Sequence, residues 1–226
     1  MENRLKVLGS WAGLIGASVM SIGLIIVAFA FVGLEGQSYS PANHFVSELG
    51  HTAASELWQV FSLVLIIGAS AFGLHMLSVG LRFRAFWRWL FIIGGLIVTI
   101  GGIGVALFPM DVNLDMHGLV ALLFFFSSMI LVTVFSAYVA LSSQAAYPRW
   151  IALVGVPLVI SSAVFLINLF AKLGESSDAL AAPEARAATD IVTISEWGVI
   201  IFLSMWVIVL AIRDLARRDA QTAHSN

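Results

Sequence analysis

The stretch Leu8–Val32, LGSWAGLIGASVMSIGLIIVAFAFV, contains no charged residue. A helix needs about 20 consecutive apolar residues to cross the roughly 30 Å of hydrocarbon in a bilayer. This stretch is long enough to do so. It is also too long for the apolar region of a signal peptide, and it has no convincing Ala-x-Ala cleavage site. We therefore expect it to be an uncleaved first transmembrane span.

The same kind of stretch recurs along the chain. Hydrophobic residues make up 60% of the sequence and charged residues 11%, whereas about a quarter of the residues in soluble domains are charged. Expected spans cover residues 8–32, 57–79, 87–108, 118–141, 150–171 and 195–213. We predict an all-α, polytopic membrane protein, in which residues 1–226 form a single domain built as a six-transmembrane-helix bundle.

The basic residues indicate the orientation of this bundle. Of the eleven Lys and Arg residues, only Lys172 and Arg186 lie in the connections that would share one side of the membrane with residues 33–56. The others precede the first span, follow the last, or lie in the second and fourth connections. Because basic residues accumulate on the cytoplasmic side, we expect both termini in the cytoplasm (N-in/C-in) and the chain in the cytoplasmic (inner) membrane.

Composition excludes several kinds of chemistry. The formal net charge is −2, which argues against a nucleic-acid partner, because phosphate binding needs clustered Lys and Arg. The sequence has no cysteine, so disulfides, thiolate metal sites and a cysteine nucleophile are excluded.

Small residues recur at every fourth position of the first span, at Gly9, Gly13, Ala17 and Ser21. Such a stripe lets two helices approach closely. We expect it to pack inside the bundle. The alternative is that it binds another copy of the chain or a helix of a partner protein.

The segment at residues 40–51, SPANHFVSELGH, is the most informative polar stretch. Ser40 followed by Pro41 is typical of a helix start, so we expect a short amphipathic helix over residues 41–49 at the outer interface. In an α-helix the side chains of His44, Ser47, Glu48 and His51 would share one face. Those types can supply a general base, a nucleophile and an orienting carboxylate. The alternative is a helix without a functional site, whose polar side chains only contact water at the membrane surface.

A second polar segment, FPMDVNLDMHG at residues 108–118, lies on the same expected side. Asn113 or Asp115 can cap the fourth span, which explains these residues without any function. His117 enters the membrane at the start of that span, where ionisable groups are costly and tend to face the bundle interior. His117 is therefore the stronger functional candidate of this segment.

Together the two segments predict one polar site on the outer side. The candidate catalytic residues are His44, Ser47, Glu48, Asp115 and His117. The candidate ligands of a divalent metal such as Zn, Mn or Fe are His44, His51, Asp111 and His117, although no HExxH spacing is present. The candidate substrate-binding residues are Asn43, Asp111, Asn113 and Glu196, the last of which could also serve only the helix N-terminus.

The motif HFVSELG at residues 44–50, with Phe108-Pro109 and His117-Gly118, resembles a prokaryotic six-span family of unknown function, DUF998. That family is similar to the damage-regulated autophagy modulators and to the membrane proteins that remodel glycosylphosphatidylinositol anchors. The matching positions are Ser47, Glu48, Gly50, Pro109 and His117. The resemblance implies a six-helix bundle with an outer polar cluster and a lipid-linked role.

These observations lead to one functional hypothesis and two alternatives. We expect an outward-facing polar pocket that binds a membrane lipid or lipid-linked head group, with a hydrolase or acyltransferase as the catalytic version. The first alternative is a non-catalytic accessory or assembly subunit of a membrane complex. The second is a small-solute transporter.

Overall fold

The computed structural model describes residues 1–144, 146–175 and 186–223. Every regular element in these residues is a helix. The elements are α1 (Glu2–Ala30), η1 (Val46–Gly50), α2 (Trp58–Gly80), α3 (Ala85–Leu107), α4 (Leu114–Leu141), α5 (Ile151–Val154), α6 (Val156–Glu175) and α7 (Ile191–Ala223). Within the described residues 6 helical segments are long and apolar enough to cross a membrane, with α5 and α6 forming one of them. The chain is therefore an all-α, multi-pass integral membrane protein.

The helices extend beyond several of the expected spans. α1 begins at Glu2 rather than near Leu8, and α7 covers Ile191–Ala223 rather than residues 195–213. An apolar run marks only the part of a helix that lies in hydrocarbon. Backbone hydrogen bonding continues into the polar residues on either side, so helix ends and hydropathy limits differ.

The fifth span is interrupted at Gly155, between α5 and α6. Pro157 has no N–H, so it cannot donate to the carbonyl of Leu153 four residues earlier. That carbonyl instead accepts a hydrogen bond from the N–H of Gly155. The break also brings the backbone close to α4, because a Cβ added at Gly155 would lie 2.6 Å from the Ser136 hydroxyl oxygen.

The short helix between α1 and α2 differs from the one expected at residues 41–49. Residues 41–43 form a turn, and the helix that follows is a 3-10 helix, Val46–Gly50. A 3-10 helix has 3.0 residues per turn, so side chains three apart are aligned and those four apart are not. His44, Ser47, Glu48 and His51 therefore do not form the shared polar face that an α-helix would give them.

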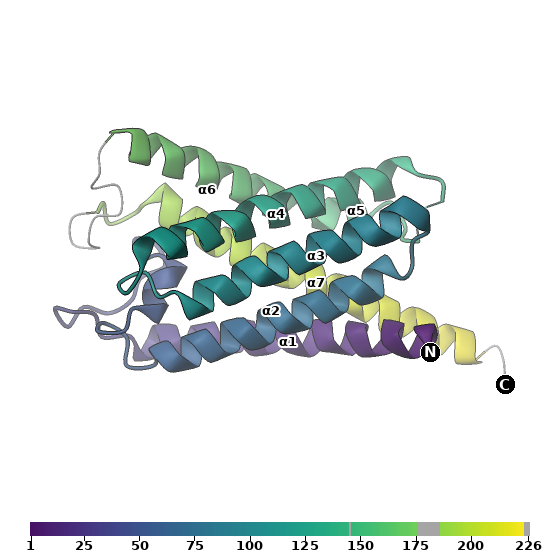
Figure 1. Ribbon diagram of the computed structural model, residues 1–226, viewed down its shortest axis with the longest axis horizontal. Coiled ribbons are helices and arrows are strands. Elements are labelled where there is room, and N and C mark those ends of the chain that lie inside the picture. Colours follow the sequence, from purple (N-terminus) through teal and green to yellow (C-terminus); the bar gives the residue numbers. More distant parts are fainter. Residues whose placement is uncertain (145, 176–185, 224–226) are drawn as a thin grey trace.

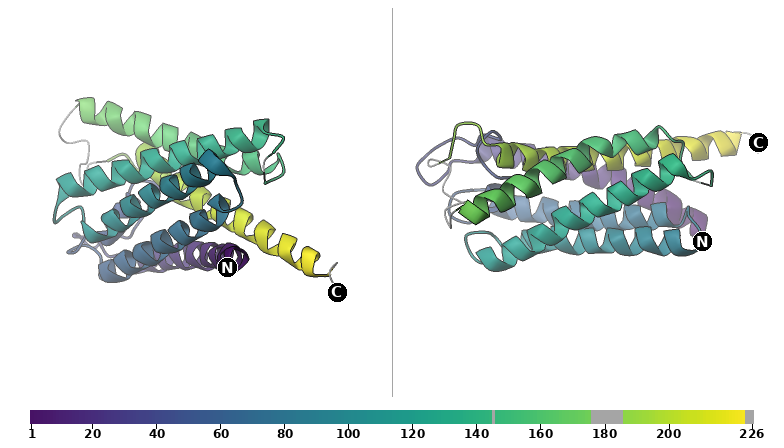
Figure 2. Two further views of the ribbon diagram at one scale, coloured as in Figure 1. Left: turned by 45° about the vertical axis from the view of Figure 1, so that its right-hand side comes forward. Right: turned by 90° about the horizontal axis from the view of Figure 1, so that it is seen from above.

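The spans form a ring in sequence order, with α7 closing it between α6 and α1. Figures 1 and 2 show this bundle of long helices, with both termini at the end opposite to η1. η1 contacts α1, α2 and α7. The ring therefore has η1 and its flanking connections at one end and both termini at the other.

Two members of the small-residue stripe of α1 pack inside this ring, against α2. A Cβ added at Gly13 would lie 2.6 Å from Cγ and Nδ1 of His75, and one added at Gly9 would lie even closer to Cβ of Ser78. A third member, Ala17, lines the interior of the ring. These three positions therefore face the inside of the bundle rather than a second copy of the chain.

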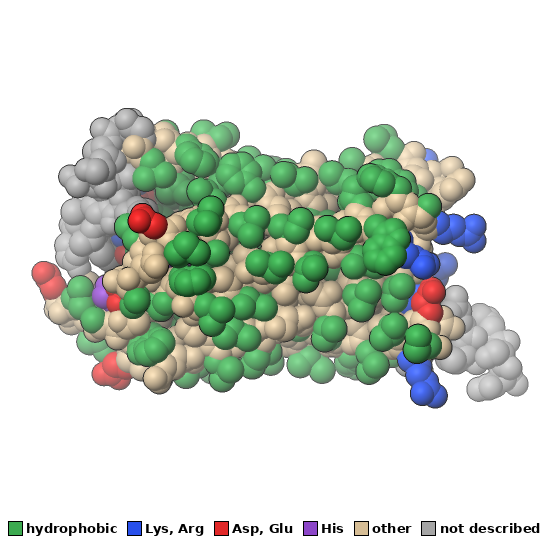
Figure 3. All heavy atoms as spheres, viewed as in Figure 1, with side chains coloured by type: hydrophobic (Ala, Val, Ile, Leu, Met, Phe, Trp, Pro, Cys, Tyr) green, Lys and Arg blue, Asp and Glu red, His purple; other side chains and the backbone are tan. Residues whose placement is uncertain are grey.

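The outside of the bundle is apolar, as lipid contact requires. Phe29 is 88% exposed and Ile167 69% exposed, which would be unfavourable in water. Hydrophobic side chains cover the middle of the face in Figure 3, with Lys and Arg gathered at one end and most acidic side chains at the other. The polar ends and the apolar middle agree with a chain that crosses a bilayer.

Candidate functional site

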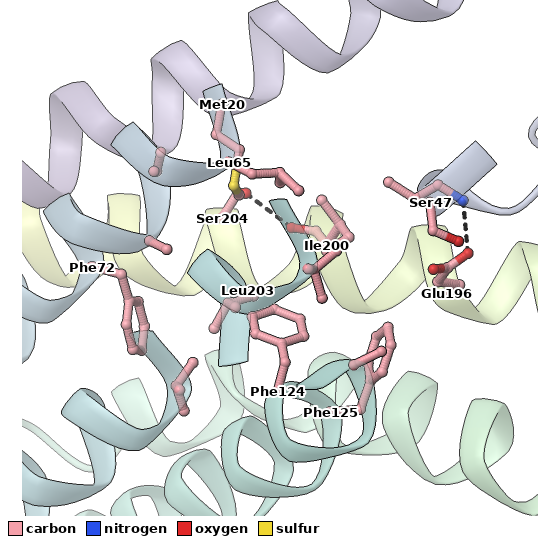
Figure 4. A pocket seen from close by; sticks show the side chains of 18 of the residues that line it. Met20, Ser47, Leu65, Phe72, Phe124, Phe125, Glu196, Ile200, Leu203 and Ser204 are labelled. Atoms are coloured by element: carbon pink, nitrogen blue, oxygen red, sulfur yellow. Dashed lines mark hydrogen bonds between the residues drawn. The ribbon is translucent and has the colours of Figure 1, made fainter. Parts of the chain in front are cut away.

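A cavity lies inside the ring, between α1, α2, α3, α4 and α7. Its volume open to water-sized molecules is about 70 Å³, which is several times the minimum that one water requires. Most of its lining is apolar. The apolar side chains labelled in Figure 4 are Met20, Leu65, Phe72, Phe124, Phe125, Ile200 and Leu203.

Three of the four polar side chains of the cavity lie at the end next to η1. Ser47, His117 and Glu196 line it there, and the hydroxyl of Ser204, further along α7, is bound to the carbonyl oxygen of Ile200 at 2.9 Å. Figure 4 shows Ser47 and Glu196 side by side. The cavity therefore combines an apolar body with one polar end.

Glu196 is held in place by the backbone of η1. Its Oε2 atom accepts a hydrogen bond from the N–H of Val46 at 2.7 Å, and the N–H of Ser47 also donates to its carboxyl group. The first N–H groups of a helix have no partner within the helix. Glu196, from the second turn of α7, supplies that partner although it is 150 residues away in sequence.

His117 has one ring nitrogen committed to the backbone. Its Nδ1 atom lies 2.8 Å from the carbonyl oxygen of Phe108. A carbonyl can only accept, so Nδ1 carries the proton, and Nε2 of the neutral ring is then an acceptor. The side chain is 7% exposed and lines the cavity. The structure thus offers an imidazole acceptor to a molecule in the cavity.

Glu48 forms a buried ion pair with Arg186 instead of facing the cavity. Arg186 Nη2 lies 2.6 Å from Glu48 Oε1, and Nη1 lies 3.1 Å from Oε2. The guanidinium also donates to the carbonyl of Asn43 at 2.6 Å and lies 4.6 Å from the ring centre of Phe45. Glu48 Oε2 accepts the N–H of Phe45 at 2.8 Å. Glu48 therefore anchors the connection before α7 to η1.

Replacing Glu48 with Gln should lower the free energy of unfolding by about 1.5–3 kcal/mol, the usual contribution of hydrogen bonds to charged groups. Gln keeps an oxygen for the N–H of Phe45 but loses the bidentate contact with Arg186. This loss corresponds to a fall in Tm of roughly 3–12 °C, measurable by thermal unfolding in detergent. Glu35→Gln, at an exposed position of the same connection, is the control. Equal Tm values for the two variants would contradict this role.

His44 is buried but does not line the cavity. Its Nδ1 atom lies 3.2 Å from the N of Ser40, and its ring packs against those of Phe31 and Tyr39 at centroid distances of 5.6 and 5.0 Å. The Tyr39 hydroxyl donates to the carbonyl of Phe45 at 2.8 Å and accepts the indole N–H of Trp197 at 2.8 Å. Burial raises the pKa of Tyr39 well above its usual value, and the nearby Glu196 carboxylate raises it further.

His51 and Asp111 meet at a different place, between the turn after η1 and the turn before α4. Asp111 accepts hydrogen bonds from the backbone and hydroxyl of Thr52, the latter at 2.5 Å. Partial burial by itself would raise the pKa of Asp111. The hydrogen bonds from Thr52 lower it, and the resulting pKa lies below its usual value. Nδ1 of His51 lies 3.5 Å from Asp111 and 3.2 Å from the N–H groups of Ala53 and Ala54. The contacts of Asp111 with His51 and Thr52 therefore join the turn before α4 to the turn after η1.

The remaining candidates also have local roles. Asn113 is the N-cap of α4 and accepts the N–H of Met116 at 3.1 Å, and Asp115 is exposed in the first turn of that helix. Asn43 contributes its carbonyl oxygen to Arg186. Of all the residues predicted for the site, only Ser47, His117 and Glu196 line the cavity.

The expected metal ligands are separated in the structure. His117 lines the cavity, His51 and Asp111 lie between the two turns, and His44 lies among aromatic rings. Among the residues that the structure describes, no group of three or more His, Cys, Asp or Glu side chains is placed to hold a metal ion. The described residues therefore give no support to the divalent metal.

Two features of the site were not recognised from the sequence. One is the apolar lining, which comes from five helices and has no local signature. The other is Arg186, for which a signal did exist, because it is one of only two basic residues in the connections on the η1 side. A basic residue at the end of the bundle that has few basic residues is a candidate for a specific ion pair.

Comparison with known proteins gives one match. A family model described as "Protein of unknown function (DUF998)" matches residues 19–213. This segment contains η1, the four polar residues of the cavity, and the Glu48–Arg186 pair. No curated protein and no solved structure matches the chain.

Proposed function

The chain belongs to the DUF998 family of proteins of unknown function, and because this membership assigns no reaction, we propose a function from the cavity. The protein binds a membrane lipid or lipid-linked molecule, with an apolar chain inside the ring of helices and the head group beside Ser47, His117 and Glu196. The observation that carries the proposal is the arrangement of the lining. Along the bundle its one polar side chain is Ser204, whose hydroxyl is bound to the carbonyl of Ile200, and its other polar side chains, Ser47, His117 and Glu196, lie next to η1.

The chemistry of the lining favours an amphipathic ligand. Ligand sites are mostly apolar, with a few polar groups that fix orientation. Here the polar groups stand at one end, so a ligand that satisfied both parts would have one polar end and one apolar end. Membrane lipids have this form, and they surround the protein at high concentration.

We place the η1 end on the outer side of a cytoplasmic membrane, with both termini in the cytoplasm. The termini lie together at the end of the bundle where Lys and Arg gather (Figures 1 and 3). The tendency of basic residues to remain on the cytoplasmic side supports this orientation. The head group would then lie in the outer leaflet.

A catalytic version of the proposal is hydrolysis or transfer of an acyl group. Nε2 of His117 would accept the proton of the Ser47 hydroxyl as its oxygen attacks an acyl ester, and would return that proton to the alcohol that leaves. Water, or the hydroxyl of an acceptor lipid, would then take the acyl group from Ser47. Glu48 and Asp115 are less suitable as the orienting carboxylate, since Glu48 is paired with Arg186 and Asp115 is exposed. Glu196 is the carboxyl group that lies beside Ser47 (Figure 4).

Filling the cavity tests the proposal. Ala121 lines the cavity from α4, and Ala121→Phe would place a ring in the space that a lipid chain needs. We expect the amount of lipid that co-purifies per protein to fall at least about tenfold, which corresponds to about 1.4 kcal/mol of binding free energy. Lipid extraction followed by mass spectrometry measures this ratio and would also reveal any hydrolysis product.

The control is Gly118→Phe, one turn earlier on the same helix. A Cβ added at Gly118 meets nothing within 4 Å, and Gly118 does not line the cavity. This variant should retain the wild-type amount of lipid. If both variants retained it, the bound lipid would lie on the outer surface of the bundle and the proposal would fail.

The accessory-subunit alternative has less support. It depended on the small-residue stripe of α1 as a docking face for a partner helix. Gly9 and Gly13 of that stripe pack against α2 of the same chain, and Ala17 lines the cavity. A partner protein would therefore have to bind elsewhere on the bundle.

A further inference from the structure

The charge of the cavity lining restricts the head groups that can enter. Among the described residues that line the cavity, the only ionisable side chains are His117 and Glu196. No Lys or Arg is among them. A buried charge needs a counter-charge or a dense set of hydrogen bonds. A phosphate or carboxylate would find no cation in this lining to balance it.

The two described cations of the η1 end, Lys172 and Arg186, are each paired with an acid. Arg186 makes the bidentate contact with Glu48, with distances of 2.6 and 3.1 Å. Lys172 lies 2.5 Å from Asp190, which also caps the start of α7 by accepting the N–H of Val192. Releasing either cation toward a ligand would leave a buried carboxylate without its partner.

The polar end of the cavity presents mostly hydrogen-bond acceptors. Nδ1–H of His117 is bound to the backbone, which leaves Nε2 as an acceptor. Glu196 contributes carboxyl oxygens, and the Ser47 hydroxyl can accept as well as donate. An acceptor-rich end is satisfied by a ligand that brings donors.

Resting on the function proposed above, we infer that the ligand is a lipid whose head group donates hydrogen bonds and carries no negative charge. The donors are hydroxyl groups, as in an acylglycerol, or the N–H groups of an amine. Anionic phospholipids and fatty acids are poor ligands of this cavity. The acyl or alkyl chain lies along the apolar lining between α1, α2, α3, α4 and α7.

Single-chain lipids that share one chain length and differ only in the head group provide the test. The full chain in lipid nanodiscs is titrated with a monoacylglycerol, a long-chain amine, a lysophosphatidic acid and a fatty acid, and bound ligand is counted by native mass spectrometry. We expect the better of the two donor head groups to bind at least about tenfold more tightly than either anion. Comparing the monoacylglycerol with the amine then identifies hydroxyl or ammonium as the preferred donor.

Equal or tighter binding of an anion would overturn the inference. If no member binds in the cavity, so that Ala121→Phe changes nothing, the proposed function itself fails.

Glu196→Gln locates the preference within the cavity. The Gln side chain has the same shape as Glu and keeps one oxygen that can accept the N–H of Val46 in η1. Its other terminal atom is an amide nitrogen, which donates hydrogen bonds instead of accepting them. The ratio between the affinity for the better donor head group and the affinity for the anions should fall at least about threefold. Glu56→Gln makes the same substitution at an exposed position of the η1 side and should leave the preference unchanged. An unchanged preference in both variants would show that Glu196 does not select the head group.

Discussion

Replacing Asp214 with Ala should lower the free energy of unfolding by about 3–5 kcal/mol, as expected when one member of a buried ion pair is removed. The Asp214 side chain is 0% exposed. Its Oδ2 atom lies 2.9 Å from Nε of Arg82, and its Oδ1 atom lies 3.1 Å from Nη1 of Arg213. The substitution would leave both guanidinium groups without their carboxylate.

The network around Asp214 joins three parts of the chain at the end that carries the termini. Arg82 comes from the connection between α2 and α3, and Arg213 and Asp214 come from α7. Tyr147, in the connection before α5, donates its hydroxyl to Asp214 Oδ2 at 2.9 Å. Burial raises the pKa of Tyr147 well above its usual value, and Asp214 adds to this effect, so the phenol remains a donor.

Thermal unfolding in detergent should show a fall in Tm of roughly 6–20 °C for Asp214→Ala, at about 2–4 °C per kcal/mol for a chain of this size. The matched control is Glu2→Ala, which removes an acid from the same end of the bundle. Glu2 is 2.7 Å from Lys6, but its side chain is 48% exposed. Exposed ion pairs contribute little to stability because solvent screens them, so this variant should melt close to the wild type. Comparable losses for both would mean that burial of Asp214 does not matter.

The transporter alternative gains no specific support from this network. Asp214, Arg82 and Tyr147 lie at the end of the bundle that carries the termini, and none of them lines the cavity.

Replacing Gly13 with Leu should prevent the bundle from folding into a monodisperse protein. A Cβ at this position would lie 2.6 Å from Cγ and Nδ1 of His75, whose side chain is 0% exposed. Extra methylenes in a packed core cost about 1–3 kcal/mol, and Leu adds four carbon atoms at a point with no space for the first. We expect a loss of more than about 3 kcal/mol and an aggregated size-exclusion profile.

A double substitution separates this clash from other effects. Gly13→Ala should destabilise the protein, and His75→Ala should restore part of that loss by removing the ring that the new methyl group meets. His75→Ala alone also loses the 3.3 Å contact between Nδ1 and the carbonyl of Gly9, so the coupling energy of the full cycle is the quantity to measure. If the effects of the two substitutions on the free energy of unfolding were additive, the methyl group at position 13 would not clash with the His75 ring. Gly118→Leu, where a Cβ meets nothing within 4 Å, should fold normally.

The site was predicted from the sequence only in part. His117 was identified because an ionisable group at the start of a span needs a reason to be there, and it lines the cavity. Ser47 and Glu196 also line it. The predicted partnership of His44, Ser47 and Glu48 was wrong, because it assumed an α-helix where η1 is a 3-10 helix. Glu48 binds Arg186, 138 residues further along the chain, and no local pattern indicates such a pair.

What the sequence determined by itself is the number of spans, the class of fold and the unequal distribution of charge between the two ends. These are properties of short segments, since the thickness of the bilayer sets the length of an apolar run that can cross it. Tertiary structure alone decided which polar groups meet and what they enclose. Glu196 caps η1 from 150 residues away, and five helices together form the cavity. Such contacts depend on how the helices pack, through close approaches like that of Gly13 to His75, and helix packing is not encoded in any one segment.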